Sequence, residues 1–409
     1  MSAELAHVRM PFGHAGSFTG TLPAQRLFLK HEAPAACGDL DALLTKALTY
    51  SAGLPGLKQA VVPDDQVVIV LDRDTPQGAA LVQGVWNVLS EAGVSPEHLH
   101  ILQPASLQPH KQTDPRTRLP EKVAGQVTWT VHDPTEAGLC NYLATTAAGE
   151  RIYLNQHLLN ADLTILIGPV LADPLLGFRG TMSAVFPGLS DTDAMRRGIG
   201  QGHEELGAND VRPLRMLVDE IGWLLGTQFC IGVVPGPGDT VHNVFAGAPD
   251  AVLRLGEQAV SGGWGVNLDQ RVELVIAAVE ADASGHHWEQ VGRAADVARR
   301  LVEQGGRIVL LTELNEQPGP GLQLLRSQRS ARAALRPLRE QKPHDVVIAS
   351  RIARAADWAH VSLASCLPDD LVEDLFLSPL HEMAEVQRLL DTDDATALLG
   401  SAQQVFVCG

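Results

Sequence analysis

The sequence predicts an α/β protein built from two α/β domains with mainly parallel sheets and an interdomain cleft. Short β-branched apolar runs alternate with amphipathic segments of helical period on both sides of about residue 265. The length of 409 residues is sufficient for two domains, and a hydrophobic content of 45% with only 4% aromatic residues predicts cores of Leu, Val, Ile and Ala. We therefore divide the chain into domains at 1–265 and 266–409.

Residues 67–102 form the clearest unit of the first domain. The run 67–71 is continuous and β-branched, which is typical of a strand buried on both faces. Residues 78–92 carry apolar side chains at helical spacing and are followed by Gly93, a typical residue at the end of a helix. A second short strand follows at 98–102. This order predicts a parallel β-α-β unit with a right-handed crossover.

The remaining elements continue the same alternation. The first domain is expected to hold strands at 126–132, 161–170 and 229–235, a short helix after 152–154, and helices at 40–50, 191–198, 211–225 and 248–262. The second domain is expected to hold strands at 272–278, 307–312, 345–349 and 360–364, and helices at 289–303 and 322–339. Residues 107–122 are polar and rich in Pro, Arg, Gln and Thr, which predicts a surface loop.

The bulk composition excludes several classes of function. A formal net charge of −17 has the wrong sign for a protein that binds phosphate backbones broadly, so we expect no nucleic acid partner. The five cysteines are scattered, so neither a disulfide framework nor a structural zinc site is predicted. The first residues lack a secretory signal and no apolar stretch is long enough to span a bilayer. We therefore expect a soluble, cytoplasmic protein with no membrane partner.

Polar residues follow the predicted strands at the positions where ligands usually bind. In open α/β sheets, ligands collect beyond the carboxyl ends of the strands. Asp72 ends a buried strand, where a carboxylate is costly unless it is bonded or hydrated, so it is either functional or a cap for the next helix. Asp173 is a candidate general base. Arg179, in a glycine-flanked loop, is a candidate for binding a carboxylate or phosphate with two hydrogen bonds.

Six segments, in their order and spacing, resemble the nickel-dependent lactate racemase family. They read GLPGLKQAVVPDDQVVIVLDRDTP, ERIYLNQHLLNADLTILIGPV, GFRGTMSAVFPGL, NDVRPLRMLVDEIG, FCIGVVPGPGDTVHNVFAG and HHWEQVGRAADVARRLVEQGGRIVLL. The resemblance implies racemisation of a 2-hydroxy acid with a nickel pincer nucleotide that is tethered through a lysine. It also implies a histidine that holds the metal and two further histidines that exchange the hydroxyl proton while the cofactor carries the hydride.

The sequence departs from this family pattern at the cofactor positions. Counting back from the Pro-Gly pair at 187–188, Ser183 stands at the lysine position and Asp173 at a histidine position. Serine lacks the amine that forms the thioamide link, so we do not expect a covalently attached nickel pincer nucleotide. The nickel-binding histidine would fall at Ile199, and His203, one helical turn further on, is the only candidate metal ligand.

Other positions of the pattern are changed in part. In the family motif Asp-x-Thr-Arg-Pro, Thr75 stands at the arginine position, whereas the aspartate is retained as Asp72. The family segment Gly-Thr-His is replaced at 105–107, with His110 nearby. The family pair Gln-x-x-Lys becomes Gln290 and Arg293, which share one helix face and keep a cation for an anionic ligand.

Three functions are open on these grounds. The first is a racemase or epimerase of 2-hydroxy acids with altered or lost nickel-pincer chemistry. The second is a non-catalytic relative that binds a small anion or a protein partner, and the third is an enzyme of another reaction class on the same fold. All three share a small anionic molecule as the ligand. The candidate catalytic residues are Asp72, Asp173 and His203, and the candidate ligand-binding residues are Arg179, Gly180, Ser183, Gln290 and Arg293.

Overall fold

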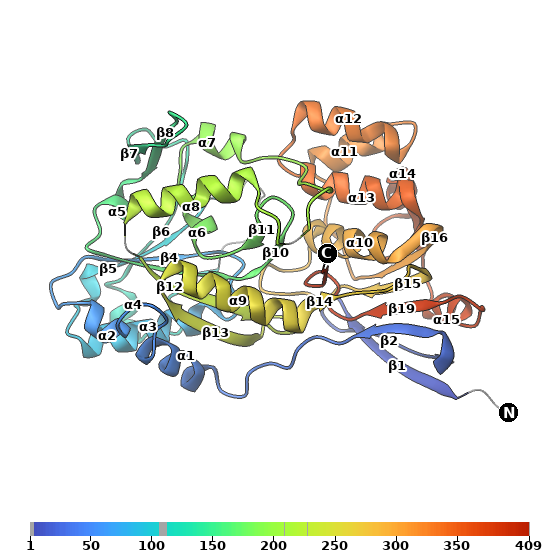
Figure 1. Cartoon of the computed structure of the whole chain (residues 1–409), viewed down its shortest axis with the longest axis horizontal. Coiled ribbons are helices and arrows are strands. Elements are labelled where there is room, and N and C mark those ends of the chain that lie inside the picture. The colour runs from blue at the N-terminus through green and yellow to red at the C-terminus, as the bar shows by residue number, and fades with distance from the viewer. Residues whose placement is uncertain (1–3, 106–112, 208, 227, 409) are drawn as a thin grey trace. The chain divides into compact units, whose positions relative to one another are not determined.

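The computed structural model of the chain describes residues 4–105, 113–207, 209–226 and 228–408. It divides into two compact units (Figure 1). The inner unit, named for its place in the sequence, comprises residues 35–199 and 208–262. The terminal unit comprises residues 1–34, 200–207 and 263–409, and so holds both ends of the chain. Each unit contains a six-stranded sheet with helices, which confirms the predicted α/β class.

The sheet of the inner unit is mainly parallel. Its strand order is β13-β12-β9-β4-β5-β6, in which the β12–β13 pair is antiparallel and the other pairs are parallel. The carboxyl ends of β4, β5, β9 and β12 therefore lie at one edge of the sheet. The strands are β4 (Val67–Leu71), β5 (Leu99–Gln103), β6 (Thr128–Val131), β9 (Leu163–Pro169), β12 (Phe229–Pro235) and β13 (Val241–Gly247).

Helices cover both faces of this sheet, which is why its central strands are apolar throughout. On one face Leu81 of α3 packs in a cluster with Ile69 of β4. On the other face Val218 of α8 packs in a cluster with Val70 of the same strand. Every residue of β4 is consequently buried. The helices are α1 (Leu40–Thr49), α2 (Leu57–Ala60), α3 (Gly78–Glu91), α4 (Glu121–Ala124), α5 (Gln156–Leu159), α6 (Met182–Val185), α7 (Thr192–Arg197), α8 (Pro213–Leu225) and α9 (Pro249–Trp264).

Two short antiparallel pairs complete the inner unit. One pair joins β7 (Cys140–Thr145) to β8 (Arg151–Asn155). The other joins β10 (Leu171–Asp173) to β11 (Gly177–Arg179), directly after β9. The chain that follows the carboxyl end of the central strand β9 therefore forms the β10–β11 pair.

The six strands of the main sheet in the terminal unit are all parallel, in the order β18-β17-β16-β15-β19-β3. One face is covered by the hairpin β1–β2 and by α15, which share a cluster with β15 and β16. Helices α10 and α13 also pack on the strands. The strands are β1 (Leu5–Phe12), β2 (Gly16–Pro23), β3 (Leu27–His31), β14 (Gly265–Val266), β15 (Val272–Ala278), β16 (Val302–Leu311), β17 (His360–Ala364), β18 (Ser378–Leu380), β19 (Thr396–Leu399) and β20 (Phe406–Val407). The helices are α10 (Trp288–Leu301), α11 (Pro320–Arg326), α12 (Ala331–Gln341), α13 (Val346–Trp358), α14 (Asp369–Asp374) and α15 (Met383–Leu390).

The division into units differs from the expected domains 1–265 and 266–409 in two respects, because residues 1–34 and residues 200–207 both group with the terminal unit. Strand β3 pairs with β19, so the first 34 residues group with the C-terminal part of the chain. A parallel partner so distant in sequence leaves no local pattern, whereas the boundary near residue 263 falls in the last turn of α9, close to the expected one.

Two local predictions for the second half of the chain were wrong. Residues 345–349, expected as a strand, open helix α13. A short apolar run cannot be distinguished from a buried helix by periodicity alone, and here the apolar pattern continues to Trp358. The single helix expected at 322–339 is divided into α11 and α12.

The expected loop 107–122 lies partly outside the described residues, because 106–112, and with them His110, are not among them. Its last part differs from the prediction, because α4 begins at Glu121. Among the described residues, no helix has the length and apolarity needed to cross a membrane.

Candidate functional site

A buried ion-pair cluster lies beyond the carboxyl end of β4 in the inner unit. Asp72 directly follows this strand, and its backbone N–H donates to the carbonyl oxygen of Ile167 at 2.8 Å, which extends the pairing with β9. The backbone oxygen of Asp72 accepts from both the N–H and the hydroxyl of Thr75, so the chain turns sharply here. The turn holds the Asp72 side chain at the edge where ligands of parallel sheets bind.

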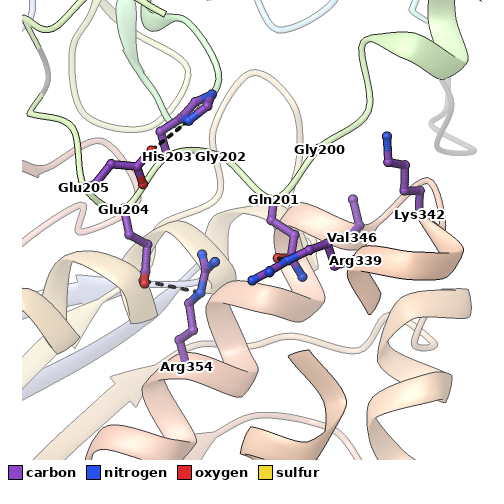
Figure 2. A pocket seen from close by; sticks show the side chains of 10 residues that line it. All are labelled: Gly200, Gln201, Gly202, His203, Glu204, Glu205, Arg339, Lys342, Val346 and Arg354. Carbon is purple, nitrogen blue, oxygen red and sulfur yellow. Dashed lines mark hydrogen bonds and ion pairs between the residues drawn. The ribbon is translucent and has the colours of Figure 1, made fainter. Parts of the chain in front are cut away.

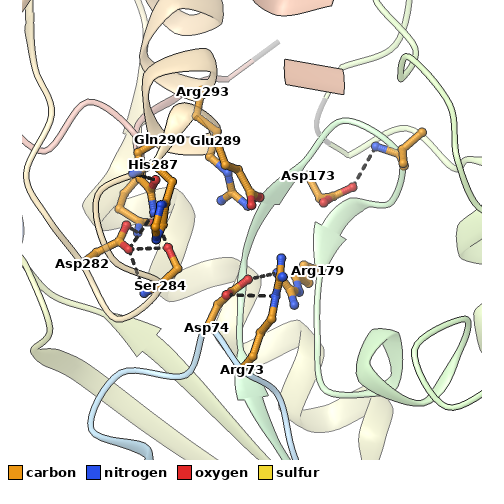
Figure 3. A network of polar contacts seen from close by, with 12 residues as sticks. Arg73, Asp74, Asp173, Arg179, Asp282, Ser284, His287, Glu289, Gln290 and Arg293 are labelled. Carbon is orange, nitrogen blue, oxygen red and sulfur yellow. Dashed lines mark hydrogen bonds and ion pairs between the residues drawn. The ribbon is translucent and has the colours of Figure 1, made fainter. Parts of the chain in front are cut away.

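Arg179 of β11 joins two carboxylates in this cluster, and Figure 3 shows its contact with one of them, Asp74. Its Nη2 lies 2.6 Å from Oδ1 and 2.7 Å from Oδ2 of Asp72, and its Nη1 lies 2.8 Å from Oδ2 of Asp74. Arg73 adds a second cation, with its Nε 3.3 Å from Oδ1 of Asp74. We name Asp72, Asp74 and Arg179 the edge cluster. The Asp72 side chain is fully buried, whereas 16% of the Arg179 side chain is exposed.

Burial and charge act in opposite directions on Asp72. Burial raises the pKa of its carboxyl above the ordinary value, and the Arg179 guanidinium beside it opposes that rise. Removing one partner of a buried ion pair costs about 3–5 kcal/mol, because the other charge is left without compensation. Asp72 therefore depends on Arg179 in the folded protein.

The other predicted residues of the inner unit have local partners. The Asp173 carboxylate accepts from the backbone N–H groups of Leu175 and Leu176 at 2.8 and 2.9 Å, which closes the turn between β10 and β11. The Ser183 hydroxyl donates to the carbonyl oxygen of Gly180 at the start of α6. A Cβ at Gly180 would lie 2.8 Å from the Leu253 side chain, so this glycine allows the close packing of α9. All three residues thus have structural contacts in addition to any role toward a ligand.

Gln290 and Arg293 lie on α10 of the terminal unit. The Gln290 side chain is buried, donates to Oδ1 of Asp282 at 3.0 Å and accepts from the backbone N–H of His287 at 2.9 Å. Its amide also donates to the Ser284 hydroxyl. Arg293, one helical turn later, lies with its Nη2 2.8 Å from Oε1 of Glu289 (Figure 3).

His287, which the sequence did not single out as functional, is a second charged group at this helix start. Its Nδ1 lies 3.4 Å from Oε1 of Glu316, and this neighbouring carboxylate raises the pKa of His287 above its usual value. The neighbouring His286 behaves in the opposite way, because burial lowers its pKa to about 4. No sequence pattern indicated this ion pair, because Glu316 lies 29 positions from His287, beyond a strand.

Asp72 and Asp173 belong to the inner unit, whereas His203 belongs to the terminal unit. Its Nδ1 lies 3.1 Å from Oε1 of Glu205. Within the described parts of the chain, no group of three or more His, Cys, Asp or Glu side chains is arranged to hold a metal ion. The structure thus brings together Asp72 with Arg179, and Gln290 with Arg293 on one helix, whereas His203 contacts the carboxylate of Glu205.

Both units are α/β structures, and the edge cluster lies beyond the carboxyl end of a parallel strand, the position at which folds of this class commonly bind ligands. Residues 14–206 match the family described as lactate racemase N-terminal domain. This part of the chain is therefore similar to the lactate racemase N-terminal domain.

Solved structures share the fold over nearly the whole chain. The lactate racemase apoprotein from Thermoanaerobacterium thermosaccharolyticum superposes with a TM-score of 0.80 at 16% identity, covering 99% of this chain and 100% of that chain. A protein from Thermotoga maritima superposes with a TM-score of 0.64 at 14% identity, covering 90% and 96%. Among curated proteins, no sequence matches this chain. At these identities the structural likeness establishes the fold alone.

The residues at the predicted tether do not fit a covalently held nickel pincer nucleotide. Such a link needs a side-chain amine, and Ser183 offers a hydroxyl that is bonded to the Gly180 carbonyl. At the position of the family histidine, Asp173 is engaged by two backbone N–H groups. The donor set is therefore one of carboxylates and guanidinium groups rather than of imidazoles and an amine.

Proposed function

We propose that this lactate racemase-like protein binds a small 2-hydroxy acid or polyol acid at the edge cluster, without a covalently attached nickel pincer nucleotide. One observation carries the proposal: a partly exposed arginine lies between two carboxylates at the carboxyl edge of a parallel sheet. A guanidinium recognises a carboxylate through paired hydrogen bonds. A carboxylate accepts a hydrogen bond from a hydroxyl group.

The chemistry of the cluster matches the two functional groups of such a ligand. The ligand carboxylate would bind the Arg179 guanidinium, which the two aspartates also contact. The 2-hydroxyl of the ligand would donate a hydrogen bond to Asp74 or Asp72. A simple carboxylic acid would bind more weakly, because it offers nothing to these acceptors while its charge is repelled by them. The two aspartates therefore select for a hydroxyl next to the carboxylate.

Racemisation or epimerisation with altered chemistry is the second candidate, and one observation favours it. Burial raises the pKa of Asp72, which brings this carboxyl closer to the range useful for a general base. The test is the loss of optical purity of L-lactate during incubation with the protein. An unchanged enantiomer ratio, together with retained binding, would restrict the function to ligand binding.

The binding proposal is tested by calorimetry on the full chain with D-lactate, L-lactate and propionate, which lacks the hydroxyl. We expect lactate to bind more tightly than propionate. Arg179→Lys keeps a positive charge beside Asp72 but loses the planar guanidinium that can make two parallel hydrogen bonds to a carboxylate. Lactate affinity should therefore fall about tenfold. Arg196→Lys, at an exposed ion pair on α7, is the matched control and should bind as the parent does. Equal affinity for lactate and propionate, or no effect of Arg179→Lys, would remove the edge cluster as the ligand site.

A further inference from the structure

The terminal unit contains a cavity of about 370 Å³ with cations on one wall. It lies between the segment 200–205 and helices α12 and α13 (Figure 2). Arg339 and Lys342 line it from α12 and the residue that ends this helix, and Arg354 lines it from α13. Its volume falls in the range of small-molecule sites.

The charge of this region is opposite to that of the chain as a whole. Residues 320–354 contain eight of the 31 lysines and arginines and only two acidic residues, although the formal net charge of the chain is −17. Such a local excess of positive charge attracts anions and costs stability through repulsion unless it is compensated. The cavity opens among these cations.

Carboxylates compensate the guanidinium groups at the cavity in part, because Glu204 and Glu205 also line the cavity and the charges of Glu204 and Asp296 act on Arg354. Oε1 of Glu204 is shared, lying 2.8 Å from Nη2 of Arg299 and 3.3 Å from Nε of Arg354. Arg339 donates from Nε to the neutral amide oxygen of Gln201 at 3.2 Å. Figure 2 shows the guanidinium groups of Arg339 and Arg354 turned toward one another. An anion between them would relieve their repulsion.

The opposite wall supplies backbone donors. In the described part of the chain, the N–H groups of residues 200–203 have no intramolecular acceptor, although these residues are half-buried. Gly202 has φ of 80°, a conformation that favours glycine, and the absent side chain leaves the backbone open to a ligand. Successive free N–H groups in a loop are a common way to bind oxyanions.

We propose that this cavity binds the phosphate group of a small phosphorylated molecule, with Arg339, Lys342 and Arg354 as cationic contacts and the N–H groups of 200–203 as donors. A phosphate monoester presents three terminal oxygens and nearly two negative charges, which match three cations and a row of N–H groups better than a carboxylate does. The site is separate from the edge cluster, which belongs to the inner unit.

The test is calorimetry on the full chain with inorganic phosphate and glycerol 3-phosphate, and with lactate as the carboxylate comparison. We expect glycerol 3-phosphate to bind, and Arg339→Ala and Lys342→Ala each to weaken binding about tenfold. Both side chains are exposed, so neither substitution should unfold the protein. Arg336→Ala is the matched control, because it removes the same charge from the exposed face of α12 outside the cavity. It should change the affinity less than about twofold.

Three results would overturn the proposal. Absence of binding at millimolar phosphate and glycerol 3-phosphate would show that the cavity takes no phosphate. Equal losses in Arg336→Ala and Arg339→Ala would assign the binding to a diffuse charged surface instead of the cavity. Equal affinity for lactate, lost in the Arg339→Ala variant, would assign the cavity to carboxylates. Circular dichroism melting of each variant verifies that the protein remains folded in every arm.

Discussion

Replacing Arg179 by methionine is the sharpest perturbation of the edge cluster. Methionine keeps a long, flexible side chain but removes the guanidinium that contacts Asp72 at 2.6 and 2.7 Å and Asp74 at 2.8 Å. The Asp72 side chain is fully buried, so its charge would lose its principal compensation. We expect the free energy of unfolding to fall by about 3–5 kcal/mol at neutral pH.

The pH dependence of this loss provides an internal check. Burial already raises the pKa of Asp72, and removal of the opposing guanidinium raises it further. The folded variant then binds a proton more tightly than the unfolded chain does, so its stability falls as pH rises from the unfolded pKa through the raised folded pKa. The cost of Arg179→Met should therefore be smaller in mild acid, where Asp72 is protonated, than at pH 7.

Urea unfolding followed by circular dichroism measures these free energies. Asp72→Asn in the Arg179→Met background removes the uncompensated charge and should recover part of the stability. The control is Arg196→Met, whose partner Asp193 lies 3.4 Å away on an exposed helix, and which should cost less than about 0.5 kcal/mol. A cost of Arg179→Met no larger than that of the control, or one that does not shrink in acid, would refute the assignment of a buried, coupled ion pair.

Three further predictions concern pH, backbone geometry and the cofactor. Burial lowers the pKa of His100 from 6.5 to about 4, so protonation of this residue should lower the free energy of unfolding as pH falls from about 6.5 to about 4. The urea midpoint of His100→Gln should therefore depend less on pH over that range than the midpoint of the parent protein does. Gly247→Ala should lower the melting temperature strongly, because φ is +135° and a Cβ would lie 2.1 Å from the backbone oxygen of Ala52, whereas Gly262→Ala, in open space on α9, should be neutral or stabilising by up to about 1 kcal/mol. Intact-mass spectrometry with nickel analysis, on protein produced together with the biosynthetic enzymes of the pincer nucleotide, should give an unmodified mass, since Ser183 has no amine; a cofactor-sized mass increase with stoichiometric nickel would contradict that reading.

The sequence was most informative where a strand is buried on both faces. Strands β4, β12 and β15 form where their apolar runs predict, because a short run of mainly β-branched and apolar residues favours a strand buried on both faces. The positions of Asp72 and Asp173 after strands followed from the same pattern. The family resemblance also placed Ser183 at the predicted tether, and its side chain offers only a hydroxyl.

Tertiary structure decided which of these residues meet. Arg179 lies 107 positions from Asp72, and its contact depends on the β10–β11 pair turning back toward the end of β4, which no local spacing encodes. His203, grouped with the aspartates from sequence, belongs instead to the terminal unit, because residues 200–207 leave the inner unit. Strand β3 likewise joins a sheet made mostly of residues after 270, through backbone hydrogen bonds that are indifferent to side-chain identity. Local pattern determined the elements, whereas long-range pairing determined the site, since charge compensation requires groups that only the complete fold brings within hydrogen-bonding distance.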